Sequence, residues 1–273
     1  MKIKLLIFKI LLASLWLPAY GQYTEVGLFG GGSNFIGDVG DYGIHIPKGY
    51  AVGGFVRYNF NERWALRLQF NYGYIANEDS SSSFGYRLNR NLHFRSHILE
   101  GSLMGEFNFL DFEPGTKHFH TPYVMGGFGI FKFNPTAVYQ GEEYELQPLG
   151  TEGQGTRANA SGPYPLASTF FVFGLGYKFS IGEFTSIAIE SNFRSTRTDY
   201  LDDVSGYYAD PEIIEEENGP VAAALSDRSI LGGDKENLLR GNPQNNDWYI
   251  FTGITLQFKF GELYEKCASF VGR

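Results

Sequence analysis

Residues 63–76 read RWALRLQFNYGYIA and alternate between large apolar side chains and small or polar ones. Successive side chains of a β-strand point to opposite faces, so this spacing places all the large apolar groups on one face. An amphipathic helix repeats every 3.6 residues and would scatter them. One face therefore carries Trp64, Leu66, Leu68, Phe70, Tyr72 and Tyr74, and the other carries Ala65, Arg67, Gln69, Asn71 and Gly73.

Seven further segments repeat this pattern. Alternation is clear over residues 184–194 and 248–260, where Phe251 is an exception. Weaker versions punctuated by glycine occupy residues 23–32, 50–60, 94–110, 123–133 and 166–179. A wall that is apolar outside and polar inside is typical of a membrane barrel. We therefore expect an all-β fold, an OmpA-like eight-stranded antiparallel transmembrane β-barrel with long extracellular loops.

The connections alternate in length, which orients the predicted barrel. Those near residues 61–62 and 181–183 are tight and that at 111–122 is moderate, whereas the others are long and polar. The long ones cover residues 34–49, 77–90, 134–165 and 198–246. Because outer-membrane barrels keep short turns in the periplasm, both chain ends are expected there. The last loop is long enough to fold over the barrel mouth or to bind a partner.

The two ends of the chain have their own signals. Lys2 and Lys4 precede an apolar run and a small-residue site, so residues 1–21 are expected to be a signal peptide and residues 22–260 the barrel. Residues 261–273 are expected to form a periplasmic tail. The single cysteine, Cys267, lies in this tail and is either free or bonded to another chain.

Charged residues on the predicted inner face need partners, because an unpaired ion in a narrow, closed interior is costly. We expect an ion-pair network that fills the lumen; the alternative is a path for protons or substrate. The residues concerned are Arg57, Arg67, Glu100, Glu106, Glu190 and Arg194.

A second polar group surrounds the base of the last long loop. Asp199, Asp202 and Asp203 lack the regular spacing and the glycine turn of a calcium loop. We therefore expect no metal site, and interpret them as anchors of the loop base. Expected contacts are Arg197, Arg240 or the strand start at Asp247 and Trp248, and Trp248 with Trp64 is expected to lie in an aromatic interface belt.

Composition and motifs limit the other functions. The net charge of −8 argues against nucleic-acid binding. His93, His97 and Ser96 resemble part of a lipid-cleaving constellation, but Ser96 points to the face opposite both histidines. We expect no catalytic residues and no cofactor.

Short motifs resemble the PorG family of type IX secretion outer-membrane proteins. They are the opening run EVGLFGGG at residues 25–32, Tyr42-Gly43, RTDYLDDVS at 197–205, and Arg240-Gly241-Asn242 followed by NDWY at 246–249. The resemblance covers most of the chain after residue 21. The loop at 210–239 matches no pattern of that family.

The resemblance implies a non-enzymatic component that anchors the periplasmic PorK and PorN ring to the outer membrane. The expected contacts are Leu263, Tyr264 and Cys267, the last through an intermolecular disulfide. Alternatives are a lipid-modifying barrel enzyme and an adhesin-like barrel that acts through its outside loops.

Overall fold

The computed structural model describes residues 23–41, 43, 46–233 and 235–260. Its strands are β1 (Tyr23–Ile36), β2 (Gly49–Asn59), β3 (Trp64–Glu78), β4 (His93–Asn108), β5 (His120–Tyr139), β6 (Glu142–Glu145), β7 (Ala167–Ser180), β8 (Thr185–Thr196) and β9 (Trp248–Phe260). Its helices are α2 (Gly85–Arg90), α3 (Pro211–Asn218) and α4 (Pro220–Ser226), with short 3-10 turns η1 (Asp79–Ser81) and η2 (Gln147–Leu149). None of the described helices has the length and apolar composition to cross a membrane.

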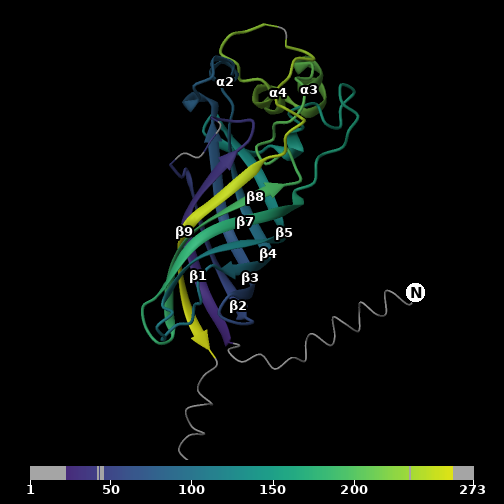
Figure 1. Ribbon diagram of the computed structural model, residues 1–273. Helices are drawn as coiled ribbons and strands as arrows, with labels where there is room; N and C mark the ends of the chain where they lie inside the picture. The colour runs from purple at the N-terminus through teal and green to yellow at the C-terminus, as the bar shows by residue number, and fades with distance from the viewer. Residues whose placement is uncertain (1–22, 42, 44–45, 234, 261–273) are drawn as a thin grey trace, which may run out of the picture.

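Eight of the strands close into an antiparallel barrel. β1 pairs with both β2 and β9, and β4 pairs with both β3 and β5, so the order runs β1-β2-β3-β4-β5-β7-β8-β9 and back to β1 (Figure 1). Closure satisfies the strand backbones within the wall, as a bilayer requires. The predicted fold is confirmed. The structure adds β6, a short hairpin partner of the extended end of β5.

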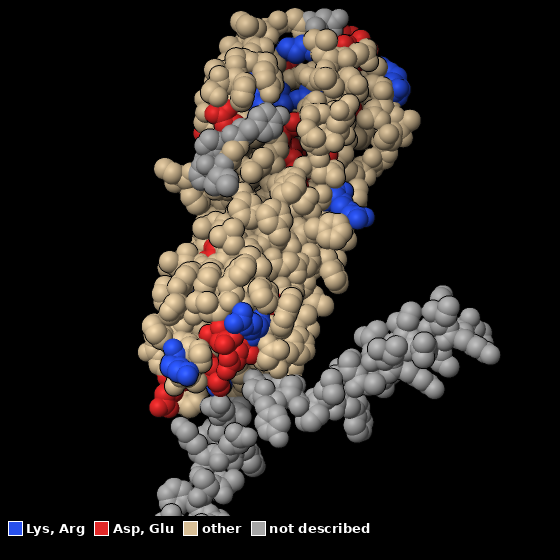
Figure 2. Space-filling view, in the orientation of Figure 1, with Lys and Arg blue, Asp and Glu red and all other residues tan. Residues whose placement is uncertain are grey.

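The alternation seen in the sequence becomes an inside and an outside. On β3, Trp64 and Phe70 are 55% and 60% exposed, whereas Arg67 and Gln69 are fully buried. The same two-residue period governs the other strands, so apolar side chains form an outer girdle. Figure 2 shows a middle band nearly free of charged residues, with Lys, Arg, Asp and Glu gathered toward the two ends of the molecule.

The long connections form a cap at one end of the barrel. α2, α3 and α4 lie together there, while the opposite end carries short turns (Figure 1). Asp210 caps α3 by accepting a hydrogen bond from the Glu212 amide at 2.8 Å, and Pro211 follows at the first helical position.

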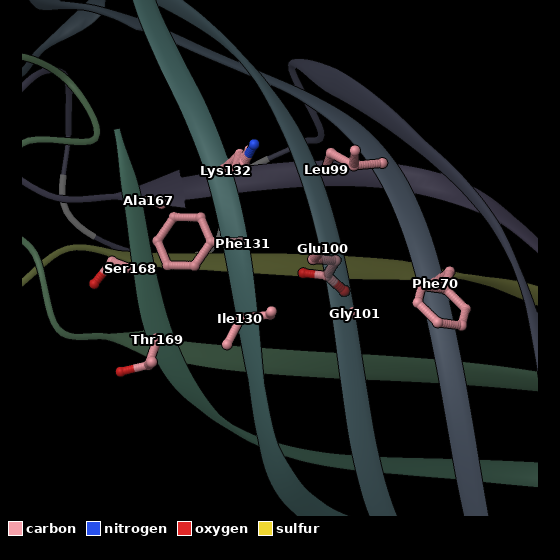
Figure 3. Close-up of a pocket in the computed structure, with 10 residues that line it drawn as sticks. All are labelled: Phe70, Leu99, Glu100, Gly101, Ile130, Phe131, Lys132, Ala167, Ser168 and Thr169. Atoms are coloured by element: carbon pink, nitrogen blue, oxygen red, sulfur yellow. The ribbon is translucent and has the colours of Figure 1, made fainter. Parts of the chain in front are cut away.

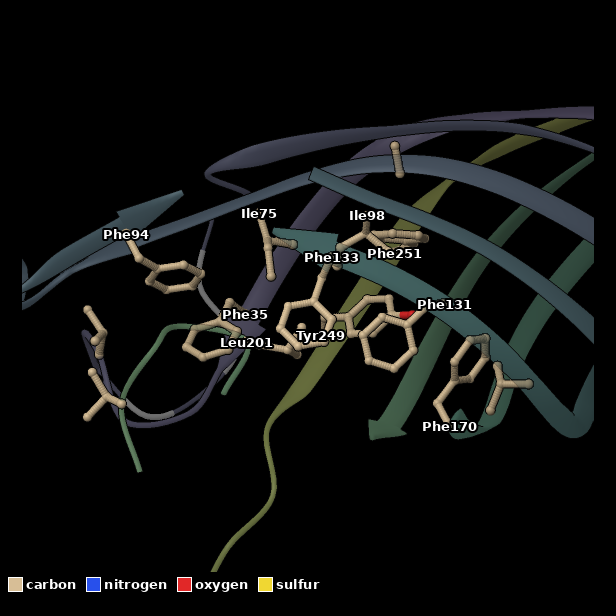
Figure 4. Packing of buried hydrophobic residues seen from close by; sticks show 14 of the residues in the cluster. Phe35, Ile75, Phe94, Ile98, Phe131, Phe133, Phe170, Leu201, Tyr249 and Phe251 are labelled. Carbon is tan, nitrogen blue, oxygen red and sulfur yellow. The ribbon is translucent and has the colours of Figure 1, made fainter. Parts of the chain in front are cut away.

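Beneath this cap, aromatic side chains fill the barrel mouth. Phe131, Phe170 and Tyr249 lie with ring centroids 5.7–6.1 Å apart. Phe35 packs edge-on against Phe94 at 4.7 Å, nearer to the loops. Figure 4 shows this cluster running along the barrel interior toward the loop end.

Candidate functional site: a filled lumen beneath an anchored loop cap

Ion pairs fill the lumen below the aromatic cluster. Arg57 lies 3.0 Å from Glu25 Oε2 through Nη1 and 2.8 Å from Glu106 Oε2 through Nε. Arg67 Nη1 lies 2.8 Å from Glu190 Oε2 and 3.3 Å from Glu106 Oε1. Lys178 Nζ approaches Glu106 at 3.6 Å. These side chains come from strands all around the wall, so the network crosses the barrel.

A second layer lies closer to the loops. Arg194 Nη2 is 2.8 Å from Glu100 Oε1, and the guanidinium lies 4.1 Å from the Phe251 ring centroid. The Tyr249 hydroxyl donates to Glu100 Oε2 at 2.6 Å. In the lower layer the Tyr123 hydroxyl donates to Glu190 Oε2, also at 2.6 Å.

The lumen is balanced in charge as well as filled. In the two layers, four cations, from Arg57, Arg67, Lys178 and Arg194, face four carboxylates, from Glu25, Glu100, Glu106 and Glu190. A further buried cation, Lys259 toward the turn end of β9, pairs with Glu113 at 2.9 Å. The structure thus brings together all six charged residues singled out on the inner face. Sequence reasoning missed Glu25 and Lys178, although both lie at inward-facing positions of their strands.

Two of the carboxylates at the base of the last loop, those of Asp202 and Asp247, hold backbone amides, whereas no backbone amide bonds to the expected anchor Asp199 in the described ranges. Asp202 accepts from the Val39 amide at 2.9 Å and from the Val204 amide at 3.0 Å. Asp247 accepts from the Leu201 amide at 2.9 Å. Two loops that are distant in sequence are therefore fastened to one another and to the start of β9.

Asp203 and Arg240 form the second part of this anchor. Arg240 Nη2 lies 3.8 Å from Asp203 Oδ2, and its Nη1 donates to the Asp203 carbonyl at 2.6 Å. The same guanidinium reaches Glu152 at 3.2 Å. Tyr164 donates to Asp203 Oδ1 at 2.7 Å. Asp203 and Arg240 therefore join the residue 150–164 loop to the last loop.

Burial shifts the protonation of these loop groups. It raises the pKa of Asp203 to about 6, although Arg240 opposes the rise. Burial raises the pKa of Asp199 to about 7; the Ser205 hydroxyl lowers this pKa, and the charges of Asp38 and Glu152 raise it. Burial beside other carboxylates also raises the pKa values of Asp202 and Asp247 well above their ordinary range.

Arg197 and Trp248, which were expected to anchor the loop base, instead contact aromatic rings. Arg197 lies over the outward-facing Phe171 ring at 5.3 Å, and no ion pair between Arg197 and Asp199 occurs in the described part of the chain. Trp248 packs edge-on against Phe173 at 6.0 Å, at the loop end of the barrel. Trp64 lies at the turn end and contacts Phe107 at 4.7 Å.

The serine and histidines on β4 do not converge. Ser96 is buried inside and accepts from the Asn134 amide at 3.1 Å. His97 lies outside against the Tyr72 hydroxyl at 2.7 Å, and His93 meets Arg228 Nη1 at 2.9 Å. Within the described ranges, no group of three or more His, Asp or Glu side chains could hold a metal ion. Leu263, Tyr264 and Cys267, together with residues 1–21, lie outside the described residues.

A closed antiparallel wall, an apolar girdle and a filled polar lumen define a β-barrel of the outer-membrane class. The chain belongs to the family described as Domain of unknown function (DUF6089), which matches residues 3–149 and 227–269. No curated protein matches it.

The solved structures that resemble the chain include the following three. The N-terminal β-barrel domain of Pseudomonas aeruginosa OprF is 13% identical, with 87% of this chain and 97% of that chain covered and a TM-score of 0.37. Ail, the attachment invasion locus protein of Yersinia pestis, in complex with sucrose octasulfate, is 11% identical, with 88% and 100% covered and a TM-score of 0.42. Neisserial surface protein A is 11% identical, with 88% and 98% covered and a TM-score of 0.38.

Proposed function

We propose that this chain is a non-enzymatic outer-membrane component of the type IX protein secretion system, of the PorG kind. In this role it anchors the periplasmic PorK and PorN ring to the outer membrane. Residues 1–21 serve as the export signal, and both chain ends face the periplasm. The motifs at residues 25–32, 197–205 and 240–249 support the assignment.

The filled lumen is the observation that carries the proposal. Two layers of ion pairs and an aromatic cluster occupy the interior, and the cap closes the loop end. A barrel filled in this way has no room for cargo. Its role in a secretion apparatus would then be to anchor other components rather than to transport cargo. We place the tether in the tail, at Leu263, Tyr264 and Cys267, with an intermolecular disulfide through Cys267.

Affinity isolation from outer membranes, with and without reductant, tests the tether. We expect the ring proteins to accompany the full chain, to be lost after deletion of residues 261–273, and to lose a higher-mass adduct in Cys267→Ser. Deletion of residues 210–239 is the matched control, because it changes the opposite end of the barrel. Co-isolation that survives the tail deletion and fails in the loop deletion would overturn the proposed tether.

A second candidate is binding through the loop cap. Among the described residues of the last loop, five apolar side chains are more than half exposed, namely Tyr207, Ile230, Leu231, Leu238 and Leu239. Exposed apolar groups of this size outside a lipid-facing wall mark interaction surfaces. Under this function, deletion of residues 210–239 abolishes binding at the cell surface and leaves secretion intact.

A further inference from the structure

The outer wall is not uniformly filled. A groove of about 540 Å³ crosses it on β3, β4, β5 and β7 (Figure 3). Gly101 and Ala167 leave the space, and the larger Phe70, Leu99 and Ile130 border it. These three side chains are 60–68% exposed, so the groove opens outward rather than into the lumen.

The upper end of the groove lies at the level of an aromatic belt. Leu99 is opposite both Tyr72 on β3 and Lys132 on β5. Tyr72 also contacts Tyr50 and His97, with ring centroids 6.4 and 5.7 Å apart. Tyrosines of this kind lie at the depth of lipid headgroups. The groove therefore runs from the headgroup level into the hydrocarbon.

Two outward-facing cations flank this end. Lys132 is opposite Ala167, the first residue of β7. On the other side of β7, the Arg197 amide donates to the Thr169 carbonyl at 3.0 Å. Neighbouring strands are about 4.8 Å apart, so the backbones that carry the two cations lie roughly 10 Å apart across β7, and the residues are offset by two positions along it.

The charges of both side chains lack a carboxylate partner in the described ranges. The Lys132 ammonium has no hydrogen bond or ion pair there, and the Arg197 guanidinium contacts the Phe171 ring. The acidic side chains on β6 are hydrogen-bonded to neutral groups rather than to these cations: Glu145 accepts from Asn134 and Glu143 accepts from Thr136. An apolar groove that ends between two unpaired cations matches a lipid with an acyl chain and a phosphate.

We infer that this groove binds one phosphorylated lipid of the leaflet at the loop end. An acyl chain lies along Leu99, Gly101 and Ile130, and the phosphate lies between Lys132 and Arg197 beside the Thr169 hydroxyl. The inference needs the barrel to be in a membrane, but it does not depend on the secretion role.

Native mass spectrometry of the purified chain in detergent tests the site, with lipid A as the probe and phosphatidylcholine as the neutral comparison. We expect one retained lipid A on the wild type. The double variant Lys132→Gln with Arg197→Gln should retain about thirtyfold less, since each of the two interfacial cations contributes about 1 kcal/mol to binding an anionic lipid.

A groove-filling variant gives an independent arm that leaves the cations in place. Ala167→Phe should also lose the lipid, whereas Leu28→Phe, on the outer face of β1 across the barrel, should retain it. Heat-modifiable migration in gels shows that each variant is folded.

Several results would overturn the site. Equal retention by the wild type and both groove variants, or equal retention of phosphatidylcholine, would mean ordinary annular lipid. Displacement of lipid A by inorganic phosphate would mean a simple anion site, and a dimer lost in Ala167→Phe would mean that a second copy occupies the groove.

Discussion

Single residues inside the lumen carry an electrostatic cost that only their partners offset. Arg67 is fully buried and reaches both Glu106 and Glu190. Arg63, in the turn immediately before β3, pairs with Asp111 at 2.6 Å, but the two side chains are 45% and 40% exposed. The two arginines therefore make a matched comparison between a buried and a solvated ion pair.

Arg67→Leu should lower the free energy of unfolding by about 3–5 kcal/mol, because it leaves buried carboxylates without their cation. Arg63→Leu should change it by less than about 1 kcal/mol. Urea unfolding in lipid vesicles, followed by tryptophan fluorescence, measures both. Equal midpoints for the two variants would contradict the network's role.

The loop carboxylates predict a pH dependence of the cap. A carboxyl group with a raised folded pKa binds its proton more tightly when folded, so its stabilisation is full below about pH 4 and disappears as the pH rises through the folded value. For Asp203 and Asp199 those values are about 6 and about 7. The cap should therefore be more stable in mild acid than at neutral pH.

Hydrogen exchange, corrected for its intrinsic pH dependence, measures this effect at amides 199–206. Protection should fall between about pH 4 and about pH 7. Asp199→Asn, which keeps the shape and removes the titration, should weaken that fall. A protection factor that rises over the same interval would show the opposite linkage.

At the scale of the element, glycines set how closely neighbouring strands approach. Gly31 on β1 is opposite Gly253 on β9. A Cβ at Gly31 would lie 2.2 Å from the Thr252 carbonyl oxygen and 2.5 Å from the Gly253 Cα, and backbone cannot move aside easily. Gly30, the preceding residue, faces outward, and a Cβ added there would have no atom within 4 Å.

Gly31→Ala should therefore destabilise the barrel by about 1–3 kcal/mol, in the range of overpacked interiors. Gly30→Ala should be neutral to within about 0.5 kcal/mol. Urea midpoints of the two variants in the same vesicles decide the matter. If the outward glycine proves the more sensitive, the assignment of the two faces is wrong.

The elements differ in how far sequence could predict them. β3 and β9 follow from their two-residue period alone. β6 does not, because its turn uses Gln140 and Gly141, both with positive φ, and glutamine is unusual in that conformation. α3 had a local signal in Asp210 and Pro211, but the surrounding loop has no periodic pattern to support it.

The site was predictable only in part for a related reason. The two-residue alternation along a strand identifies which residues face inward, and it is enough to place Arg57, Arg67 and Glu190 in the lumen. Their partners depend on the register between strands that are distant in sequence. Arg240 meeting Glu152 and Asp203 depends on how two long loops fold together, which no local spacing encodes.

At the scale of the whole molecule, the proposed orientation predicts that the two ends of the barrel differ in exposure to the cell's surroundings. Gly162 lies in a long loop and Gly182 in a short turn, and both have open space at the Cβ position. An epitope inserted at Gly162 should be reached by antibody on intact cells. The same epitope at Gly182 should be reached only after permeabilisation, and the reverse pattern would invert the proposed orientation.

The lumen's ion pairs also have a consequence for assembly. Glu190 on β8 pairs with Arg67 on β3, and Arg194 on β8 pairs with Glu100 on β4. The charges on these N-terminal strands are therefore neutralised only when a C-terminal strand has docked. A β8 that docked one residue out of step would turn Glu190 and Arg194 toward hydrocarbon. A mispaired intermediate therefore has a higher free energy than the correctly paired one before the barrel closes. The charged interior in this way selects the correct strand register during closure.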